Sequence, residues 1–81
     1  MKTSIILHER VCELRKQKRL KQSELGEILG LSDKSISAIE SGFRKTTVDK
    51  LVLLAEYFHV STDYLLGITD DPAWRGPKEE P

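Results

Sequence analysis

Hydrophobic residues recur along the chain at helical spacing, in five segments separated by short polar turns. In the first segment, Leu7, Val11 and Leu14 fall on one helical face, and charged residues occupy the other faces. The positions of the fourth segment that we expect to face inward are Val48, Leu51, Leu54, Ala55 and Phe58. The pattern predicts helices over approximately residues 5–19, 22–29, 33–41, 47–58 and 62–66.

Residues 22–41 contain two of these segments, joined by a tight turn. Gly30 is the residue type best suited to the left-handed position that ends a helix, and Ser32 is a good N-cap for the next helix. Leu31 and Ile36 stand on either side of that cap, at the positions of a hydrophobic staple, which fixes the angle of entry into the helix. This arrangement is typical of a helix-turn-helix motif.

The later turns carry the same signals. Either Thr46 or Thr47 is expected to cap the fourth helix. Ser61 is expected to cap the fifth helix, with Val60 and Leu65 as the staple around it. The starts of the third, fourth and fifth helices are therefore predicted from side chains within about one turn of each start.

The composition changes after the fifth predicted helix, where Asp and Pro become frequent. We therefore expect a helical domain over residues 1–68 and a short tail over residues 69–81. Trp74 is the only large apolar residue of that tail. It either docks on its own domain or on a partner chain, or it is exposed to solvent.

The motifs in combination resemble the Cro and phage-repressor type of helix-turn-helix regulator, also called the xenobiotic-response-element (XRE) type. The resemblance covers roughly residues 7–67, with Gln22 opening the first helix of the motif, a small residue at Gly26 and the turn over residues 30–32. It implies an all-α, five-helix, lambda-repressor-like DNA-binding domain. The chain departs from the family pattern at Lys21, where Ser, Thr or Asn is usual and can accept the N-cap hydrogen bond.

The distribution of charge is compatible with this resemblance. The formal net charge is zero, which alone would count against a nucleic-acid partner. However, residues 1–50 hold eleven Lys and Arg against seven Asp and Glu, a balance of +4, and residues 51–81 hold two against six, a balance of −4. A domain divided in this way can present a positive face to DNA. Random scatter of surface charge is the alternative.

Carried over by position, the resemblance implies two sets of DNA-binding residues. Those expected to face base edges are Asp33, Lys34, Ser37 and Ala38. Those expected to contact phosphates are Lys21, Gln22, Ser35, Arg44 and Lys45. Two simpler interpretations stay open, because Asp33 also suits the positive end of the helix dipole and Lys34 also suits a solvated surface.

The resemblance further implies a structural ion pair between Arg15 and Glu40, since the matching residues pair in several family members. Such a pair would hold the second helix of the motif, the recognition helix, against the first helix of the domain. Two unrelated surface charges are the alternative.

The sequence gives little support to catalysis. His8 and Glu9 begin a pattern like that of a zinc protease, but Cys12 stands where the second histidine would be. We expect no enzyme activity, no metal and no cofactor. A lone cysteine fits a reducing cytoplasm, and no apolar run approaches the ~18 residues of a membrane span.

The sequence therefore predicts a cytoplasmic regulator that binds double-stranded DNA, acting as a repressor and as a homodimer on a palindromic operator. We expect dimerisation through the apolar residues of the fifth helix and the tail, namely Leu65, Leu66, Ile68 and Trp74. The alternative is a protein-interaction module on the same scaffold, such as the antitoxin of a toxin–antitoxin pair or an adaptor with a protein partner.

Overall fold

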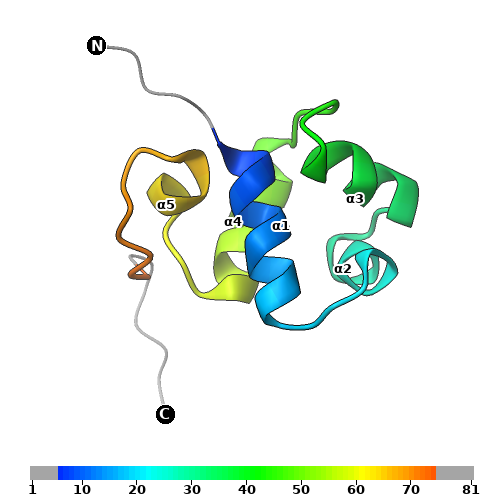
Figure 1. The fold of residues 1–81 in the computed structure, drawn as a ribbon, viewed down its shortest axis with the longest axis horizontal. Coiled ribbons are helices and arrows are strands. Elements are labelled where there is room, and N and C mark those ends of the chain that lie inside the picture. Colours follow the sequence, from blue (N-terminus) through cyan, green and yellow to red (C-terminus); the bar gives the residue numbers. More distant parts are fainter. Residues whose placement is uncertain (1–5, 75–81) are drawn as a thin grey trace.

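The computed structural model describes residues 6–74, and within that range the chain forms five helices. They are α1 (Leu7–Gln17), α2 (Gln22–Leu29), α3 (Asp33–Glu40), α4 (Val48–Phe58) and α5 (Thr62–Leu66) (Figure 1). The predicted all-α, five-helix architecture is confirmed. None of these helices is both long and apolar enough to cross a membrane.

Local capping sets the starts of α3, α4 and α5. Ser32, Thr47 and Ser61 each use the side-chain oxygen to accept a hydrogen bond from the backbone N–H three residues later. The cap of α4 is therefore Thr47 and not Thr46. Gly30 ends α2 with φ of 71°, a left-handed conformation that costs glycine little.

The first helix is shorter than predicted, and the expectation that it reaches residue 19 is wrong. Lys18 is its C-cap, and Arg19 adopts a left-handed φ of 56°. This turn redirects the chain so that Leu20 packs against the core. Residue 5, the predicted start, lies outside the described residues.

The hydrophobic core draws on all five helices. Its buried residues are Val11, Leu25, Leu29, Ile36, Leu54, Ala55, Phe58, Val60 and Leu65. The prediction that Val48 faces inward is wrong, because this first residue of α4 is 74% exposed. Leu51, one turn later, is half-buried against the core. The inward stripe of α4 thus begins one turn later than the periodicity indicated.

The motif of α2, turn and α3 is packed too closely to admit a larger residue at Gly26. A Cβ atom at this position would collide with the carbonyl oxygen of Leu31. The carbonyl of Gly26 also accepts a hydrogen bond of 2.7 Å from the backbone N–H of Leu31.

The α2–α3 pair lies to one side of α1, and α5 lies to the other (Figure 1). The α2–α3 motif thus lies at one edge of the domain.

Candidate nucleic-acid interface

One face of α3 is anchored in the domain and the other is open. Ile36 and Ile39 are 1% and 3% exposed and attach the helix to the core. The four residues predicted to face base edges share the outer side, with Asp33, Lys34 and Ser37 exposed and Ala38 half-buried. The Ser32 cap keeps the first turn regular, so the helix presents a polar surface beginning at its N-terminal end.

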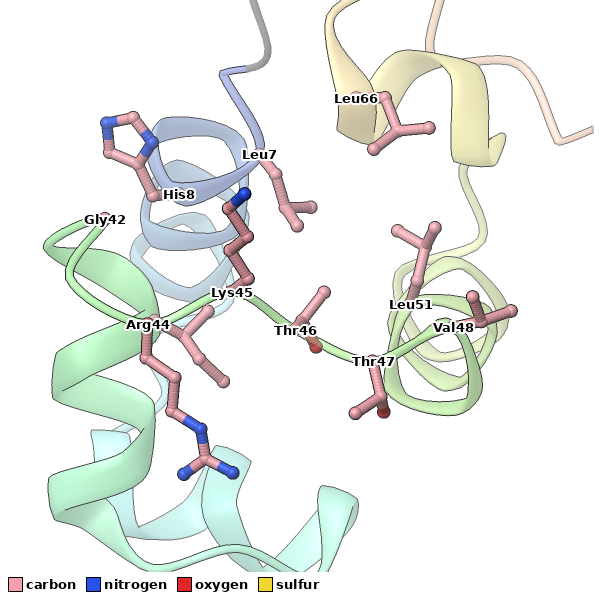
Figure 2. Close-up of a pocket in the computed structure, with 11 residues that line it drawn as sticks. Leu7, His8, Gly42, Arg44, Lys45, Thr46, Thr47, Val48, Leu51 and Leu66 are labelled. Atoms are coloured by element: carbon pink, nitrogen blue, oxygen red, sulfur yellow. The ribbon is translucent and has the colours of Figure 1, made fainter.

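The loop after α3 folds back onto this helix. The backbone N–H of Arg44 donates to the carbonyl of Ala38 at 3.1 Å, and its guanidinium Nη1 donates to Ser35 Oγ at 2.9 Å. Figure 2 shows the Arg44 side chain running along α3, whereas Lys45 points the other way, towards Leu7 at the start of α1. The structure thus brings Arg44 and Ser35 together and separates both from the Lys45 side chain.

The start of α2 supplies two more of the predicted phosphate contacts. Lys21, the N-cap of α2, is exposed, and its backbone N–H donates to Glu24 Oε1 at 2.7 Å. Glu24 thus supplies the reciprocal half of a capping box, which satisfies the N–H of the cap residue itself and not the N–H groups of the first helical turn. The side chain of Gln22 is half-buried and already engaged, since Nε2 donates to Glu40 Oε1 at 3.1 Å.

An ion pair ties α1 to the end of α3. Arg15 Nε donates to Glu40 Oε2 at 2.6 Å, and Arg15 Nη2 donates to Glu40 Oε1 at 3.0 Å. The remaining Nη1 of Arg15 donates to the carbonyl of Leu20 at 2.7 Å. The two side chains are only 13% and 5% exposed, so the pair is largely removed from water.

This environment determines the charge state of the pair. Burial acts to raise the pKa of the Glu40 carboxyl, but the hydrogen bonds from Arg15 and Gln22 outweigh it, so that pKa lies below its usual value. The hydrogen bond with Glu40 raises the pKa of Arg15. Both groups are charged at neutral pH. Together with Gln22, they link α1, the start of α2 and the end of α3.

The residues predicted to form a dimer contact are not gathered on one exposed surface. The prediction is wrong for Leu65, which is 0% exposed because it belongs to the core of its own chain. Trp74 docks on its own domain, where its ring stacks on His59 with centroids 5.0 Å apart and an angle of 21°. Leu66 is half-buried, and Ile68 is 59% exposed.

The segment after α5 is held by a residue that the sequence analysis did not single out. Arg10 Nη2 pairs with Asp70 Oδ1 at 2.8 Å, and Nη1 donates to the carbonyl of Thr69 at 3.4 Å. The Arg10 guanidinium also lies 4.0 Å from the centroid of the Tyr64 ring. Arg10 had no distinguishing sequence signal, because its partners are about sixty residues away.

Comparisons with known proteins agree with this geometry. The model of a family described as Helix-turn-helix matches residues 13–65. The chain is 42% identical over 64 residues to the uncharacterised HTH-type transcriptional regulator YobD of Bacillus subtilis (strain 168). The match covers 79% of this chain and 57% of that relative. It spans about half the length of the curated relatives it matches. These relatives are named as transcriptional regulators, not as enzymes.

Solved structures show the same fold. The P22 c2 repressor, crystallised in complex with a synthetic operator, superposes with a TM-score of 0.70 at 32% identity, over 74% of this chain and 91% of the repressor. A transcriptional regulator from Listeria innocua superposes with a TM-score of 0.77 at 33% identity, over 79% of this chain and 60% of that one. The lambda-repressor-like fold predicted from the sequence is confirmed.

Proposed function

We propose that this chain, which belongs to the helix-turn-helix family of the XRE (Cro and phage-repressor) type, acts as a repressor that binds a palindromic operator as a homodimer. The observation that carries the proposal is the outer face of α3, which is exposed at Asp33, Lys34 and Ser37 while Ile36 and Ile39 hold the opposite face in the core. The repressor of known structure with the same fold was crystallised with its operator, which supports the same use of this surface.

The first turns of α3 enter the major groove in this proposal. A major groove admits an α-helix, and residues near the helix N-terminus reach the base edges. Lys34 suits the O6 and N7 acceptors of guanine, and Asp33 suits the N4 donor of cytosine. Ser37 and the half-buried Ala38 lie one turn further along, where a small side chain allows close approach to a base.

Phosphate contacts flank the helix in this proposal. Arg44 lies along α3, and its hydrogen bond to Ser35 orients the guanidinium, so Ser35 acts as a positioning residue as much as a ligand. Lys21 and the N-terminus of α2 approach the backbone from the other side, with Gln22 positioned by Glu40. Lys45 adds positive charge to the same loop.

The proposal is tested by selection from random DNA duplexes with the purified protein. We expect enrichment of an inverted repeat whose half-sites lie about one helical turn, roughly 34 Å, apart. Affinity for the selected duplex should fall with rising salt, with a logarithmic slope of about 0.9 per cationic phosphate contact. Failure to enrich any sequence, or an affinity insensitive to salt, would refute the proposal. Absence of enrichment together with a stoichiometric co-purifying protein would favour the interaction-module alternative.

A further inference from the structure

The last carbonyl of α2 lies at the turn of the motif and is held by a side chain from α4. Lys50 Nζ donates to the carbonyl oxygen of Leu29 at 2.6 Å, across 21 positions of the sequence. The ammonium also lies beside Gly30, because a Cβ atom added there would be 3.9 Å from Nζ. Lys50 is half-buried in the first turn of α4, where its backbone N–H donates to the hydroxyl of the capping Thr47. The contact therefore joins the capped start of α4 to the turn between α2 and α3.

This contact supplies what the end of α2 lacks. The last carbonyl groups of a helix have no intrahelical partner and form the negative end of the helix dipole. In the turn, backbone N–H groups donate to the carbonyls of Gly26 and Glu27, and among residues 6–74 no loop or turn N–H donates to that of Leu29. The last turn of α2 also contains no basic residue. Lys50 therefore brings from α4 both the missing donor and the missing positive charge.

We propose that Lys50 is a positioning residue for DNA recognition, which fixes the direction of α3 through the end of α2 and makes no contact with DNA itself. The inference rests on the proposed repressor function. Only two residues separate Leu29 from Ser32, the N-cap of α3, so a shift at the end of α2 moves the start of α3, where Lys34 lies. A binding surface needs its side chains held to within about 0.5 Å by packing and by hydrogen bonds behind them.

The Lys50 contact complements the ion pair at the other end of α3. The ion pairs of the described residues join Arg15 to Glu40 and Arg10 to Asp70, so no carboxylate of residues 6–74 competes with the carbonyl for Lys50. A hydrogen bond from a charged donor is shorter and stronger than a neutral one, and the 2.6 Å distance agrees with this. The recognition helix is thus fixed at its end by Arg15 and at its start, through the turn, by Lys50.

The proposal is tested with Lys50→Met, which keeps the aliphatic stem and removes the ammonium. Binding is measured over a range of salt to the selected operator, to operators with single base changes and to an unrelated duplex, at a temperature where circular dichroism shows every variant folded. We expect operator affinity to fall about ten-fold, the size of one good base contact, with little change for the unrelated duplex and no change in the salt slope. Lys50→Arg, which can still donate to the carbonyl, should recover most of the loss.

The matched comparison is Lys45→Met, which removes the same charge from the loop after α3. It should weaken binding to all duplexes similarly and lower the slope of log affinity against log salt by about one unit. The same pattern in Lys50→Met would make Lys50 a phosphate ligand and overturn the proposal. A folded Lys50→Met protein with unchanged operator affinity and base preference would also overturn it, because the contact would then not position α3.

Amide hydrogen exchange without DNA separates this inference from the proposed function. The N–H of Leu31 donates to Gly26 within the turn, and the N–H of Val60 donates to Ala55 beyond the opposite end of α4. We expect Lys50→Met to accelerate exchange at Leu31 about ten-fold more than at Val60, since losing the contact opens the turn locally. Equal acceleration at both amides would indicate a general loss of stability and overturn the positioning role. Selective acceleration at Leu31 in a protein that binds no operator would refute the repressor and retain the hold of Lys50 on the turn.

Discussion

The ion pair between Arg15 and Glu40 should be strongly coupled, and a double-mutant cycle with Arg15→Met and Glu40→Leu measures the coupling. Each single change leaves a largely buried partner without its opposite charge. Arg15 would keep its hydrogen bond to the carbonyl of Leu20, and Glu40 would keep the hydrogen bond from the amide of Gln22, but neither would keep its opposite charge. Removing one member of a buried pair costs up to about 3–5 kcal/mol, whereas removing both for apolar residues costs much less.

The exposure of the pair sets the expected magnitude. Because the side chains are 13% and 5% exposed and joined by two hydrogen bonds, we expect each single variant to lose about 2–4 kcal/mol of unfolding free energy. The double variant should lose less than the sum of the two losses by about 1–3 kcal/mol. Urea unfolding followed by circular dichroism measures all four proteins under one condition.

A matched control lies on the same helix. Arg10 pairs with Asp70, but the Asp70 side chain is 99% exposed, so Arg10→Met and Asp70→Leu should show no measurable coupling. Additive losses at Arg15 and Glu40 would refute the reasoning, since they would mean that the two charges do not depend on each other. Equal coupling in both pairs would also refute it, because burial would then not be the cause.

The pH dependence provides an independent check on the same pair. The pKa of Glu40 is lower in the folded chain than its usual value of 4.5, so ionisation of Glu40 stabilises the fold above that value. This contribution is lost as the pH falls from near 4.5 through the lower folded-state pKa. The stability difference between wild type and Glu40→Gln should therefore shrink on acidification over this range. A difference that stays constant with pH would contradict the assignment.

Two further predictions concern the recognition surface, and a third concerns the packing of the motif beneath it. Lys34→Ala should cost about 1–3 kcal/mol of binding free energy on the selected operator and relax the preference at one base pair per half-site. Arg44→Ala should weaken binding to all sequences similarly and lower the slope of log affinity against log salt by about one unit. Quantitative binding to operator variants would reject these roles if Lys34→Ala left the ranking of the variants unchanged. Ser35→Ala should reproduce part of the Arg44→Ala loss and add little to it in the double variant, and fully additive losses in DNA binding would show that Ser35 does not act through Arg44. Gly26→Ala should destabilise the fold by about 1–3 kcal/mol because its Cβ meets the backbone of the turn, and an unchanged denaturation midpoint would refute that steric argument.

The sequence by itself determined where α2 ends and where α3 and α5 begin. Gly30, Ser32 and Ser61 act through hydrogen bonds and dihedral angles within one turn of their own position. Such signals need no knowledge of the rest of the fold. The helix-turn-helix pattern was readable for the same reason, because its staple and its close crossing at Gly26 involve residues close in the chain.

Only the tertiary structure decided which side chains are covered. Leu65 and Leu66 are neighbours of similar chemistry, yet one is completely buried and the other lines an open groove. Trp74 packs on His59 because the segment after α5 turns back across the domain, and Val48 is exposed although it continues the apolar period of α4. The periodicity of apolar residues indicates which face of a helix is apolar, but the exposure of those side chains depends on whether a distant element lies over that face. The contacts of Arg44 with Ser35 and of Arg10 with Asp70 likewise arise from packing between segments, which no local pattern encodes.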